Sequence, residues 1–431
     1  MTFVMLNRLA ELLLRSNSQI LKSVRITHPF IIVDEFQDTT YSQFDFLLSA
    51  FGGTSNVITA VGDDKQRIMV WAGARPDAFV LFEREFQALP IQLLYNFRSS
   101  PDLVRIQHVV ARALDPNTTQ AQSQSTRTIS GDVAQIWKFV SEDDEAEEIA
   151  SWIANEIAAR GTTPRDYAIL VRQTAERFEE QLKAAMLRRG IRIRNESRAI
   201  GRTTLQDLLV EEISFVGIAI LRLAANRRSP ESWDVASKAI FHIRGVDPFD
   251  QVHLRKVERE LVEFMTELKE YMNIAPPSED ATTHISDRLF EFLNVSSLAQ
   301  AYIEYNSGDL LSIVIEAFRL HLTVSANEMD NWNGVLDNFE GKDHVPLMTV
   351  HKSKGLEYDS VIFVGLHDRA WWSHSPGNYE GLATFFVALS RAKQRAIFTF
   401  CEGEGRERVS DLYQLLSDAG VPEIGFGANN E

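Results

Sequence analysis

Two adjacent carboxylates follow the first strongly apolar stretch of the sequence. Residues 30–38 read FIIVDEFQD, and Asp34 and Glu35 stand where the apolar run ends. The run predicts a buried parallel strand, and an open α/β sheet binds its ligand at the carboxyl ends of such strands. Phosphoryl transfer uses such a pair: one carboxylate holds the water shell of Mg²⁺, and the other orients or deprotonates the attacking water. The alternative is a strand that ends in two solvated acids.

Two further apolar runs also end in polar side chains. Residues 56–61 read NVITAV and are followed by Gly-Asp-Asp-Lys-Gln, which ends at Gln66. Residues 91–100 predict a third strand, with Asn96 and Arg98 near its end. Because parallel strands present their carboxyl ends at one edge of a sheet, the recurrence favours a site over isolated solvated acids.

The composition bounds the class of protein. The 431 residues predict two to four domains, and 45% hydrophobic with 24% charged residues is typical of a soluble globular protein. The single cysteine, Cys401, excludes an intramolecular disulfide and a cysteine-rich metal site. No apolar run approaches a membrane span of roughly 18 residues and no secretion signal is evident, so we expect a cytoplasmic protein without a membrane partner. The net charge of −16 argues against a surface that binds nucleic acid everywhere, but it allows a local basic groove.

The remaining chain predicts an α/β fold with a helical insertion. Apolar spacing indicates helices at 3–22, 40–51, 143–160, 174–189 and 380–393, and strands at 133–140, 167–172, 191–195, 345–350, 359–365 and 395–400. Residues 115–131 are rich in Ser, Thr and Gln and predict a loop. Between about 200 and 340 the period is helical throughout, with amphipathic stretches at 204–226, 248–273, 284–304 and 307–322. The β-α-β alternation on either side of this block predicts a second parallel sheet that the block interrupts.

Five segments, in this order, resemble motifs of the UvrD/Rep-type helicases of superfamily 1. They are VDEFQDT (33–39, motif II), VGDDKQRIMVWAGA (61–74, motif III), LLYNFRSS (93–100, motif IV), LMTVHKSKGLEYDSVIFVG (347–365, motif V) and FFVALSRAK (385–393, motif VI). The resemblance covers nearly the whole chain. It implies a partial first RecA-like motor domain at 1–100 and a second RecA-like parallel-sheet domain at 101–200 and 341–415. An all-α insertion at 201–340 and a flexible tail at 416–431 complete the expected organisation.

The resemblance also implies roles for matching residues in a site for ATP and Mg²⁺. These roles are Mg²⁺ binding for Asp34, activation of the hydrolytic water for Glu35, γ-phosphate sensing for Gln66, nucleotide binding for Gly355 and Glu357, and γ-phosphate contacts from the second motor domain for Arg98 and Arg391. At the DNA track it implies base stacking by Trp71 and contacts from Thr349 and His351. Each side chain has a structural alternative: a surface ion pair for either arginine, a core position for the tryptophan, and a core or capping position for the histidine.

The implied activity is that of an ATP-dependent 3′ to 5′ DNA helicase or translocase on single-stranded DNA or a single-strand/duplex junction. Hydrolysis would be coupled to closure of the cleft between the motor domains. The different class of function that stays open is a non-hydrolysing, helicase-derived subunit that binds DNA or protein. Motif III departs from the family at Met69 and Ala72, where an aromatic residue and an arginine are usual. Translocation is therefore expected more firmly than unwinding.

No Gly-x-x-x-x-Gly-Lys-Ser/Thr sequence, the Walker A phosphate-binding loop, occurs among the 431 residues. We therefore expect the loop to come from a missing N-terminal segment or from a partner chain, and we expect the chain to be inactive without it. A truncated form of an ordinary helicase is the other explanation. The 30–35 strand would lack a neighbour, and an unpaired apolar edge is an aggregation hazard.

An arginine-rich segment spans residues 183–202. It contains Lys183, Arg188, Arg189, Arg192, Arg194, Arg198 and Arg202. Clustered cations of this kind could follow a phosphate backbone. A solvated helix and hairpin face is the alternative.

Overall fold

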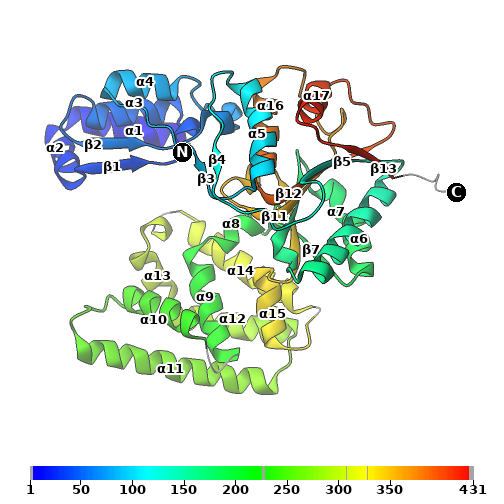
Figure 1. Cartoon of the computed structure of the whole chain (residues 1–431). Helices are drawn as coiled ribbons and strands as arrows, with labels where there is room; N and C mark the ends of the chain where they lie inside the picture. The colour runs from blue at the N-terminus through cyan, green and yellow to red at the C-terminus, as the bar shows by residue number, and fades with distance from the viewer. Residues whose placement is uncertain (1–2, 226–228, 307, 328, 427–431) are drawn as a thin grey trace. The chain divides into compact units, whose positions relative to one another are not determined.

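The computed structural model describes residues 3–225, 229–306, 308–327 and 329–426 (Figure 1). The chain divides into two units. The first comprises Met1–Glu145, Tyr167–Thr174 and Thr349–Glu431, and the second comprises Ala146–Asp166 and Ala175–Met348. No helix in the described ranges is long and apolar enough to cross a membrane.

The first unit opens with helices around a two-stranded parallel sheet. The elements are α1 (Phe3–Ser16), α2 (Ser18–Thr27), β1 (Phe30–Val33), α3 (Tyr41–Phe51), β2 (Val57–Ala60) and α4 (Ala78–Phe86). The helix predicted over 3–22 is two helices. Asn17 has extended backbone angles (φ −128°, ψ 98°), and its side chain accepts hydrogen bonds from the backbone N–H groups of Gln19 and Ile20. This N-cap starts a new helix where the apolar pattern alone predicts continuation.

Strand β1 lies where the sequence predicts it, but it is not buried on both faces. Ile31 and Val33 pack toward the helices, whereas Phe30 and Ile32 are 74% and 76% exposed. β1 pairs only with β2 in a two-stranded sheet of the described residues. The expectation of burial is therefore wrong for one face, because no described element covers it.

The large parallel sheet confirms the predicted α/β class. In the first unit its strands lie in the order β13 (Glu423–Phe426), β5 (Ala134–Phe139), β12 (Ala392–Cys401), β11 (Tyr358–Val364) and β6 (Tyr167–Val171), and all neighbours are parallel. Helices α5 (Pro101–Leu114) and α16 (Tyr379–Ser390) pack together and against β12, and α17 (Ser410–Asp418) contacts α5 (Figure 1). β6 is buried along its whole length, which matches its run of apolar residues.

Two expectations differ from the structure in the first unit. The strand predicted over 91–100 shrinks to β3 (Tyr95–Asn96), which pairs with β4 (Gln122–Ser123) inside the predicted 115–131 loop. Leu89, Ile91 and Leu93, which precede β3, are all at least 80% exposed. The tail expected from 416 instead holds the end of α17 and then β13, and residues 427–431 lie outside the described residues.

The second unit contains two parallel strands and a helical block. Its elements are α6 (Glu142–Arg160), α7 (Glu176–Arg188), β7 (Arg192–Asn195), β8 (Ala199–Ile200), β9 (Thr203–Thr204), α8 (Leu205–Leu209), α9 (Glu212–Ala225), α10 (Pro230–Ile243), α11 (Gln251–Ile274), α12 (Glu279–Leu293), α13 (Val295–Ala301), α14 (Leu310–Ala326), α15 (Trp332–Glu340) and β10 (His344–Thr349). β7 and β10 are parallel neighbours. In the described residues from 205 to 340 there are helices and no strand, whereas the short strand β9 lies inside the 201–340 range predicted to be helical throughout.

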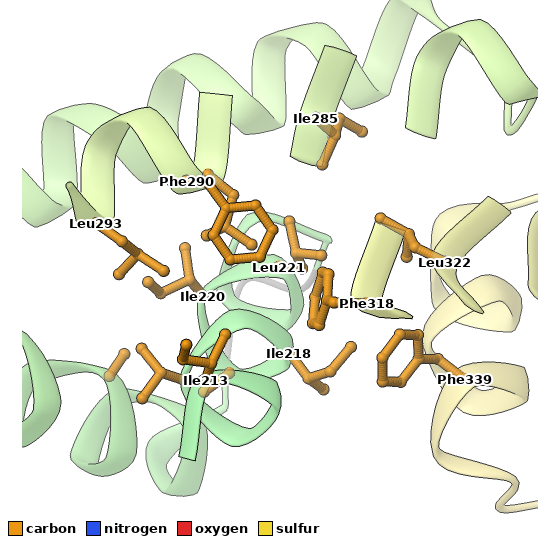
Figure 2. Packing of buried hydrophobic residues seen from close by; sticks show 14 of the residues in the cluster. Ile213, Ile218, Ile220, Leu221, Ile285, Phe290, Leu293, Phe318, Leu322 and Phe339 are labelled. Atoms are coloured by element: carbon orange, nitrogen blue, oxygen red, sulfur yellow. The ribbon is translucent and has the colours of Figure 1, made fainter. Parts of the chain in front are cut away.

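Helix α9 lies at the centre of the helical block. Ile213, Ile220 and Leu221 are fully or almost fully buried, and they belong to one cluster with Phe290 of α12 and Phe318 of α14 (Figure 2). A Cβ atom on Gly217 would lie 2.9 Å from the Phe318 ring, so a side chain there is excluded. The close approach lets aromatic rings fill the interior, and burial of each ring contributes about 1.5–3 kcal/mol. Packing, more than helix propensity, therefore defines this block.

One buried acid gives the first unit a pH-dependent stability. Burial raises the pKa of Glu145 to about 7, although the Thr399 hydroxyl opposes this shift and the charge of Glu142 adds to it. A raised folded pKa means that this group's stabilisation is present below pH 4.5 and is lost as the pH rises through 7. We therefore compare the unfolding free energy of Glu145→Gln with that of wild type at two pH values. The difference should favour the variant by up to about 3 kcal/mol more at pH 8 than at pH 4.

Urea unfolding of wild type and Glu145→Gln across this range checks the prediction. Glu148→Gln, on the same helix, is the control. An unfolding free energy that differs between wild type and Glu145→Gln by the same amount at pH 4 and pH 8 would contradict the assignment.

Candidate functional site

The two carboxylates after β1 stand on a tight turn. Glu35 has φ 49°, in the left-handed region, and a 3₁₀ turn over Phe36–Asp38 follows it. Phe36 is fully buried, and its ring meets Phe79 and Phe82 edge-on at centroid distances of 5.2 and 5.0 Å. Asp34 is exposed, and one of its carboxylate oxygens accepts a hydrogen bond of 2.8 Å from the Glu35 N–H. The aromatic anchor holds the acids at the strand end.

Gln37 joins this turn to the polar segment after β2. Its Oε1 accepts a hydrogen bond from the Asp63 N–H at 3.1 Å, and its Nε2 donates to the Glu35 carboxylate. A Cβ atom on Gly62 would lie 2.2 Å from the Gln37 Oε1, so only glycine fits between the two turns. No role for Gln37 is predicted from the sequence, because an amide one residue after a buried phenylalanine carries no distinct pattern.

Lys354 is a second contact that the sequence analysis missed. Its Nζ lies 2.9 Å from Glu35 Oε2 and also forms an ion pair with Asp38. Burial raises the pKa of Asp38, while the nearby Lys354 opposes that shift. The lysine therefore brings the segment after β10 to the carboxylates after β1. Its place inside the HKSKGLE run of the motif V segment was the available signal.

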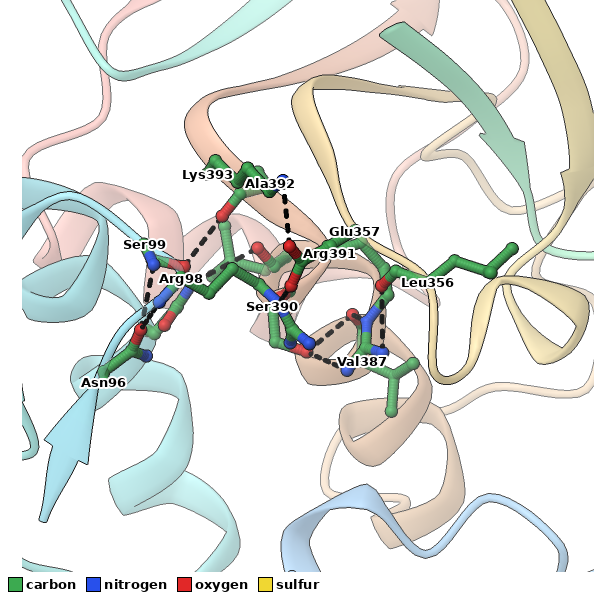
Figure 3. Close-up of polar contacts among 12 residues, drawn as sticks. Asn96, Arg98, Ser99, Leu356, Glu357, Val387, Ser390, Arg391, Ala392 and Lys393 are labelled. Atoms are coloured by element: carbon green, nitrogen blue, oxygen red, sulfur yellow. Dashed lines mark hydrogen bonds and ion pairs between the residues drawn. The ribbon is translucent and has the colours of Figure 1, made fainter. Parts of the chain in front are cut away.

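Arg391 contacts Gln66, the last residue of the polar turn Asp64–Gln66 after β2. It caps the C-terminus of α16, is 2% exposed, and donates from Nη2 to Gln66 Oε1 at 3.0 Å. Its Nε donates to the Val387 carbonyl at 3.1 Å (Figure 3). Burial lowers the pKa of Arg391 to about 10, and the neighbouring charge of Arg98 adds to this effect. The side chain still carries its charge at neutral pH, and the alternative of a surface ion pair does not apply to it.

Arg98 and Glu357 form the other polar contact in Figure 3. Arg98 Nε lies 2.7 Å from Glu357 Oε2, and Lys393 Nζ lies 2.8 Å from Glu357 Oε1. Hydrogen bonds from Lys393 and then Arg98 lower the pKa of Glu357 to about 2. Asn96 at the end of β3 accepts hydrogen bonds from the N–H groups of Arg98 and Ser99, at 2.9 and 2.8 Å. The Arg98 ion pair thus joins two predicted site residues, and the turn after β3 positions it.

Gly355 lies in the exposed turn between Lys354 and Glu357. Its φ is +82°, a conformation that favours glycine. The glycine therefore allows the chain to reverse between two charged site residues.

The residues predicted for DNA lie on neighbouring turns. Trp71 is 71% exposed, which excludes the core alternative. His351 Nε2 lies 3.3 Å from the carbonyl oxygen of Ile68, three residues before Trp71, and burial lowers the pKa of His351. Thr349 is half-buried at the end of β10. The structure thus brings the histidine to the turn that carries the exposed indole.

Tyr379, at the start of α16, contacts the preceding 3₁₀ turn, Asp64–Gln66, and its C-cap Arg67. Its hydroxyl donates to the Asp64 carbonyl at 2.8 Å, and the Arg67 guanidinium lies 4.8 Å from its ring centre. Neither Tyr379 nor Arg67 was predicted from the sequence, because the pairing joins segments more than 300 residues apart.

The arginine-rich segment of the second unit is largely ion-paired. Arg188 and Arg189 contact Glu147, Arg194 contacts Glu196, and Arg202 lies near Asp309 and Glu316. These partners favour the ion-paired surface over the phosphate track. Arg194 departs from both alternatives, because it is buried.

The arrangement in the first unit suits a polyphosphate. Two arginines and Lys354 lie among Glu35, Gln66 and Glu357, so cations and hydrogen-bonding groups that can meet a transferring phosphoryl group are gathered there. The exposed oxygens of Asp34 match the oxygen ligands that Mg²⁺ prefers. Within the described ranges no group of three or more metal-ligating side chains occurs.

Comparison with known proteins identifies the family. Residues 2–87 match the model of the UvrD/REP helicase N-terminal domain, and residues 91–269 and 251–403 match the UvrD-like helicase C-terminal domain. The chain is 23% identical to the ATP-dependent DNA helicase Rep of Buchnera aphidicola subsp. Acyrthosiphon pisum, over 90% of this chain and 65% of that protein. It is 25% identical to the Escherichia coli helicase of the same name, over 91% of this chain and 63% of that protein. With DNA helicase II of Salmonella typhimurium it shares 26% identity, over 91% and 59% of the two chains.

The chain thus spans roughly three-fifths of the length of these relatives. The family models cover both the carboxylate turns and the segments that carry Arg98, Glu357 and Arg391. The resemblance predicted from the motifs is confirmed, and the chain belongs to the UvrD/Rep-type helicase family.

Proposed function

We propose that the first unit contributes most of the nucleotide site of an ATP-driven motor that moves 3′ to 5′ on single-stranded DNA. The observation that carries the proposal is the 3.0 Å hydrogen bond from Arg391 to Gln66, which joins side chains 325 positions apart in the sequence. The buried Arg391 and its partner Gln66 belong to the same candidate site as Asp34 and Glu35. A buried guanidinium there adds little to stability, whereas phosphoryl transfer requires a cation that neutralises the charge developing on the phosphate.

In the proposed reaction each side chain acts on the terminal phosphate or the attacking water. Glu35 orients and deprotonates the water, and Lys354 and Gln37 hold its carboxylate in place. Gln66 contacts the γ-phosphate, and Arg391 and Arg98 neutralise the charge that develops on it. Asp34 would hold Mg²⁺, which, when bound, neutralises phosphate charge. Glu357 and Gly355 belong to the nucleotide pocket.

We propose that the phosphate-binding loop comes from a polypeptide segment outside these 431 residues, either an N-terminal continuation or a separate subunit. No phosphate-loop sequence occurs within them. The exposed face of β1, with Phe30 and Ile32, supports a further element that covers it. The chain alone should therefore hydrolyse no ATP, and activity should appear when that segment is supplied.

Single-stranded DNA would bind beside the nucleotide. Trp71 presents an exposed indole, and stacking of a base on such a ring contributes about 1–3 kcal/mol. Thr349 and His351 lie at the adjacent turn, so we place them along the same strand of DNA.

Glu35→Gln tests the proposed reaction. In the complete enzyme, with the phosphate-binding loop supplied, the variant should lower the kcat of DNA-stimulated ATP hydrolysis by roughly 10²- to 10⁴-fold, because the amide cannot accept the proton of water. The KM for ATP should change little. Steady-state phosphate release at saturating single-stranded DNA measures both constants.

Glu83→Gln, on the exposed surface of α4, is the matched control and should be fully active. An unchanged rate in Glu35→Gln would reject this mechanism and would favour the non-hydrolysing, DNA- or protein-binding alternative.

A further inference from the structure

We propose that Trp372 is a second base-stacking platform for single-stranded DNA; this inference rests on the proposed function. Trp372 lies in the loop between β11 and α16, and its side chain is 63% exposed. Its indole Nε1 donates a hydrogen bond to Gln173 Oε1 at 3.3 Å. The bond uses the polar edge of the ring, so the faces of an exposed indole are held in a defined orientation.

The backbone beneath the ring is also held in place. The neighbouring Trp371 is 1% exposed, and the Arg172 guanidinium lies 5.5 Å from its ring centre. The Trp371 N–H donates to the His367 carbonyl at 3.0 Å, and the Arg408 guanidinium donates to the Trp372 carbonyl at 3.1 Å. One buried and one exposed tryptophan thus form an anchor and a platform, and an ordered platform loses less conformational entropy when a base stacks on it.

A series of contacts connects this platform to the residues already assigned to DNA. Gln173 lies two residues after Val171, whose carbonyl accepts a hydrogen bond from the Val350 N–H at 2.9 Å. Val350 separates Thr349 from His351.

The contacts continue from His351 to the segment that carries Trp71. The His351 ring contacts the carbonyl of Ile68, three residues before Trp71. The two exposed indoles are therefore linked through one turn, and a strand of DNA that crosses this turn can meet both.

A cation at the backbone of Trp372 completes the site. Arg408 is exposed, and in the part of the chain that the structure describes no carboxylate pairs with its guanidinium. Asp368 accepts hydrogen bonds from the backbone N–H groups of Glu407 and Arg408 instead, at 3.0 and 2.7 Å. An indole face for a base and a guanidinium for the adjoining phosphate are the two contacts that non-specific binding of single strands uses. Because the protein as a whole is acidic, an exposed arginine without a carboxylate partner is a specific indication of a phosphate contact.

Binding of a fluorescently labelled oligo(dT) to the full chain, followed by anisotropy, tests the proposal. Trp372→Ala should weaken the Kd by roughly 5- to 150-fold, and Trp372→Phe should retain part of the affinity, because a smaller ring still stacks. Trp71→Ala should weaken binding in the same range. The matched control is Phe249→Ala, which removes a side chain that is 90% exposed in the helical block and should leave the Kd unchanged.

The salt dependence separates stacking from charge. Arg408→Ala should reduce the slope of log K against log salt by about 1, whereas Trp372→Ala should leave the slope unchanged. If the wild-type chain binds no oligo(dT), the proposed function and this inference both fail. If Trp71→Ala weakens binding while Trp372→Ala and Trp372→Phe bind like wild type, only the assignment of Trp372 is overturned.

Discussion

Arg391→Ala is expected to lower the kcat of DNA-stimulated ATP hydrolysis by roughly 10³- to 10⁵-fold, the contribution of an arginine that neutralises the transferring phosphoryl group. The side chain is 2% exposed and already contacts Gln66, so water cannot replace its charge easily. The rate of phosphate release by the complete enzyme, with the phosphate-binding loop supplied and single-stranded DNA saturating, measures the loss.

Two further variants make this result specific. Arg391→Lys keeps the charge but loses the planar fork, so most of the rate should still be lost. Arg84→Ala removes an exposed arginine of α4 and should retain full activity. Because Arg391 also donates to the Val387 carbonyl, thermal unfolding of each variant must accompany the assay. A folded Arg391→Ala enzyme that hydrolyses ATP at the wild-type rate would refute the assigned role.

Arg194→Met should destabilise the second unit by about 3–5 kcal/mol, the cost of breaking a buried ion pair by removing one partner. Arg194 donates to both carboxylate oxygens of Glu196, at 2.8 and 3.1 Å. It also donates to the carbonyls of Asn338, Phe339 and Glu340, where α15 ends. Methionine fills similar space but leaves the buried Glu196 carboxylate with the exposed Arg165, at 3.0 Å, as its cation, and it leaves three helix-end carbonyls without these donors. The unfolding free energy in urea checks the prediction.

The double variant Arg194→Met/Glu196→Leu distinguishes a lost ion pair from lost packing. Glu196→Leu removes the buried carboxylate that Arg194→Met leaves without its buried partner, so part of the stability should return. Lys238→Met, which breaks an exposed pair with Asp234 on α10, is the control and should change the stability by less than about 1 kcal/mol. If Arg194→Met unfolds at the same urea concentration as wild type, the pair is not a structural anchor.

Strands and helices with a strong apolar period were predictable. β6, β11 and β12 lie within a residue or three of their expected limits, because runs such as Val361 to Val364 have few alternatives to a buried parallel strand. α10 and α15 lie in the block that was predicted to be helical, but their individual bounds were not predicted. Their apolar positions are interrupted by polar residues, and they become helices through packing in the block around α9.

The predictions of one helix over 3–22 and of a strand over 91–100 were wrong for different physical reasons. Asn17 separates the two helices, because its side chain accepts the hydrogen bonds that cap the second one. The apolar period continues across Asn17, so the pattern of apolar residues does not reveal the break. The 91–100 segment has the composition of a strand, but only Tyr95 and Asn96 find a partner among the described residues. Strand formation depends on such a neighbour, which composition cannot supply.

Some residues of the candidate site were predictable from the sequence, and others were not. Asp34, Glu35 and Gln66 are recognisable because each follows an apolar strand at a sheet edge. Lys354 and Tyr379 are not, since their roles follow from contacts with residues more than 300 positions away. The assignments of catalytic, nucleotide-binding and DNA-binding roles remain predictions that the variants above test.

The position of β12 between β5 and β11 has a consequence for synthesis. Ala134 of β5 pairs with Ala396 of β12, so about 250 residues must leave the ribosome between the two partners. At roughly 5–20 residues per second this takes on the order of 10–50 s. During that interval β5 and β6 lack the neighbours that bury them, while the helices of residues 205–340 can already form their local contacts. The nascent chain therefore carries uncovered strand edges until almost its last residues emerge, and its yield should depend on how well molecular chaperones shield them.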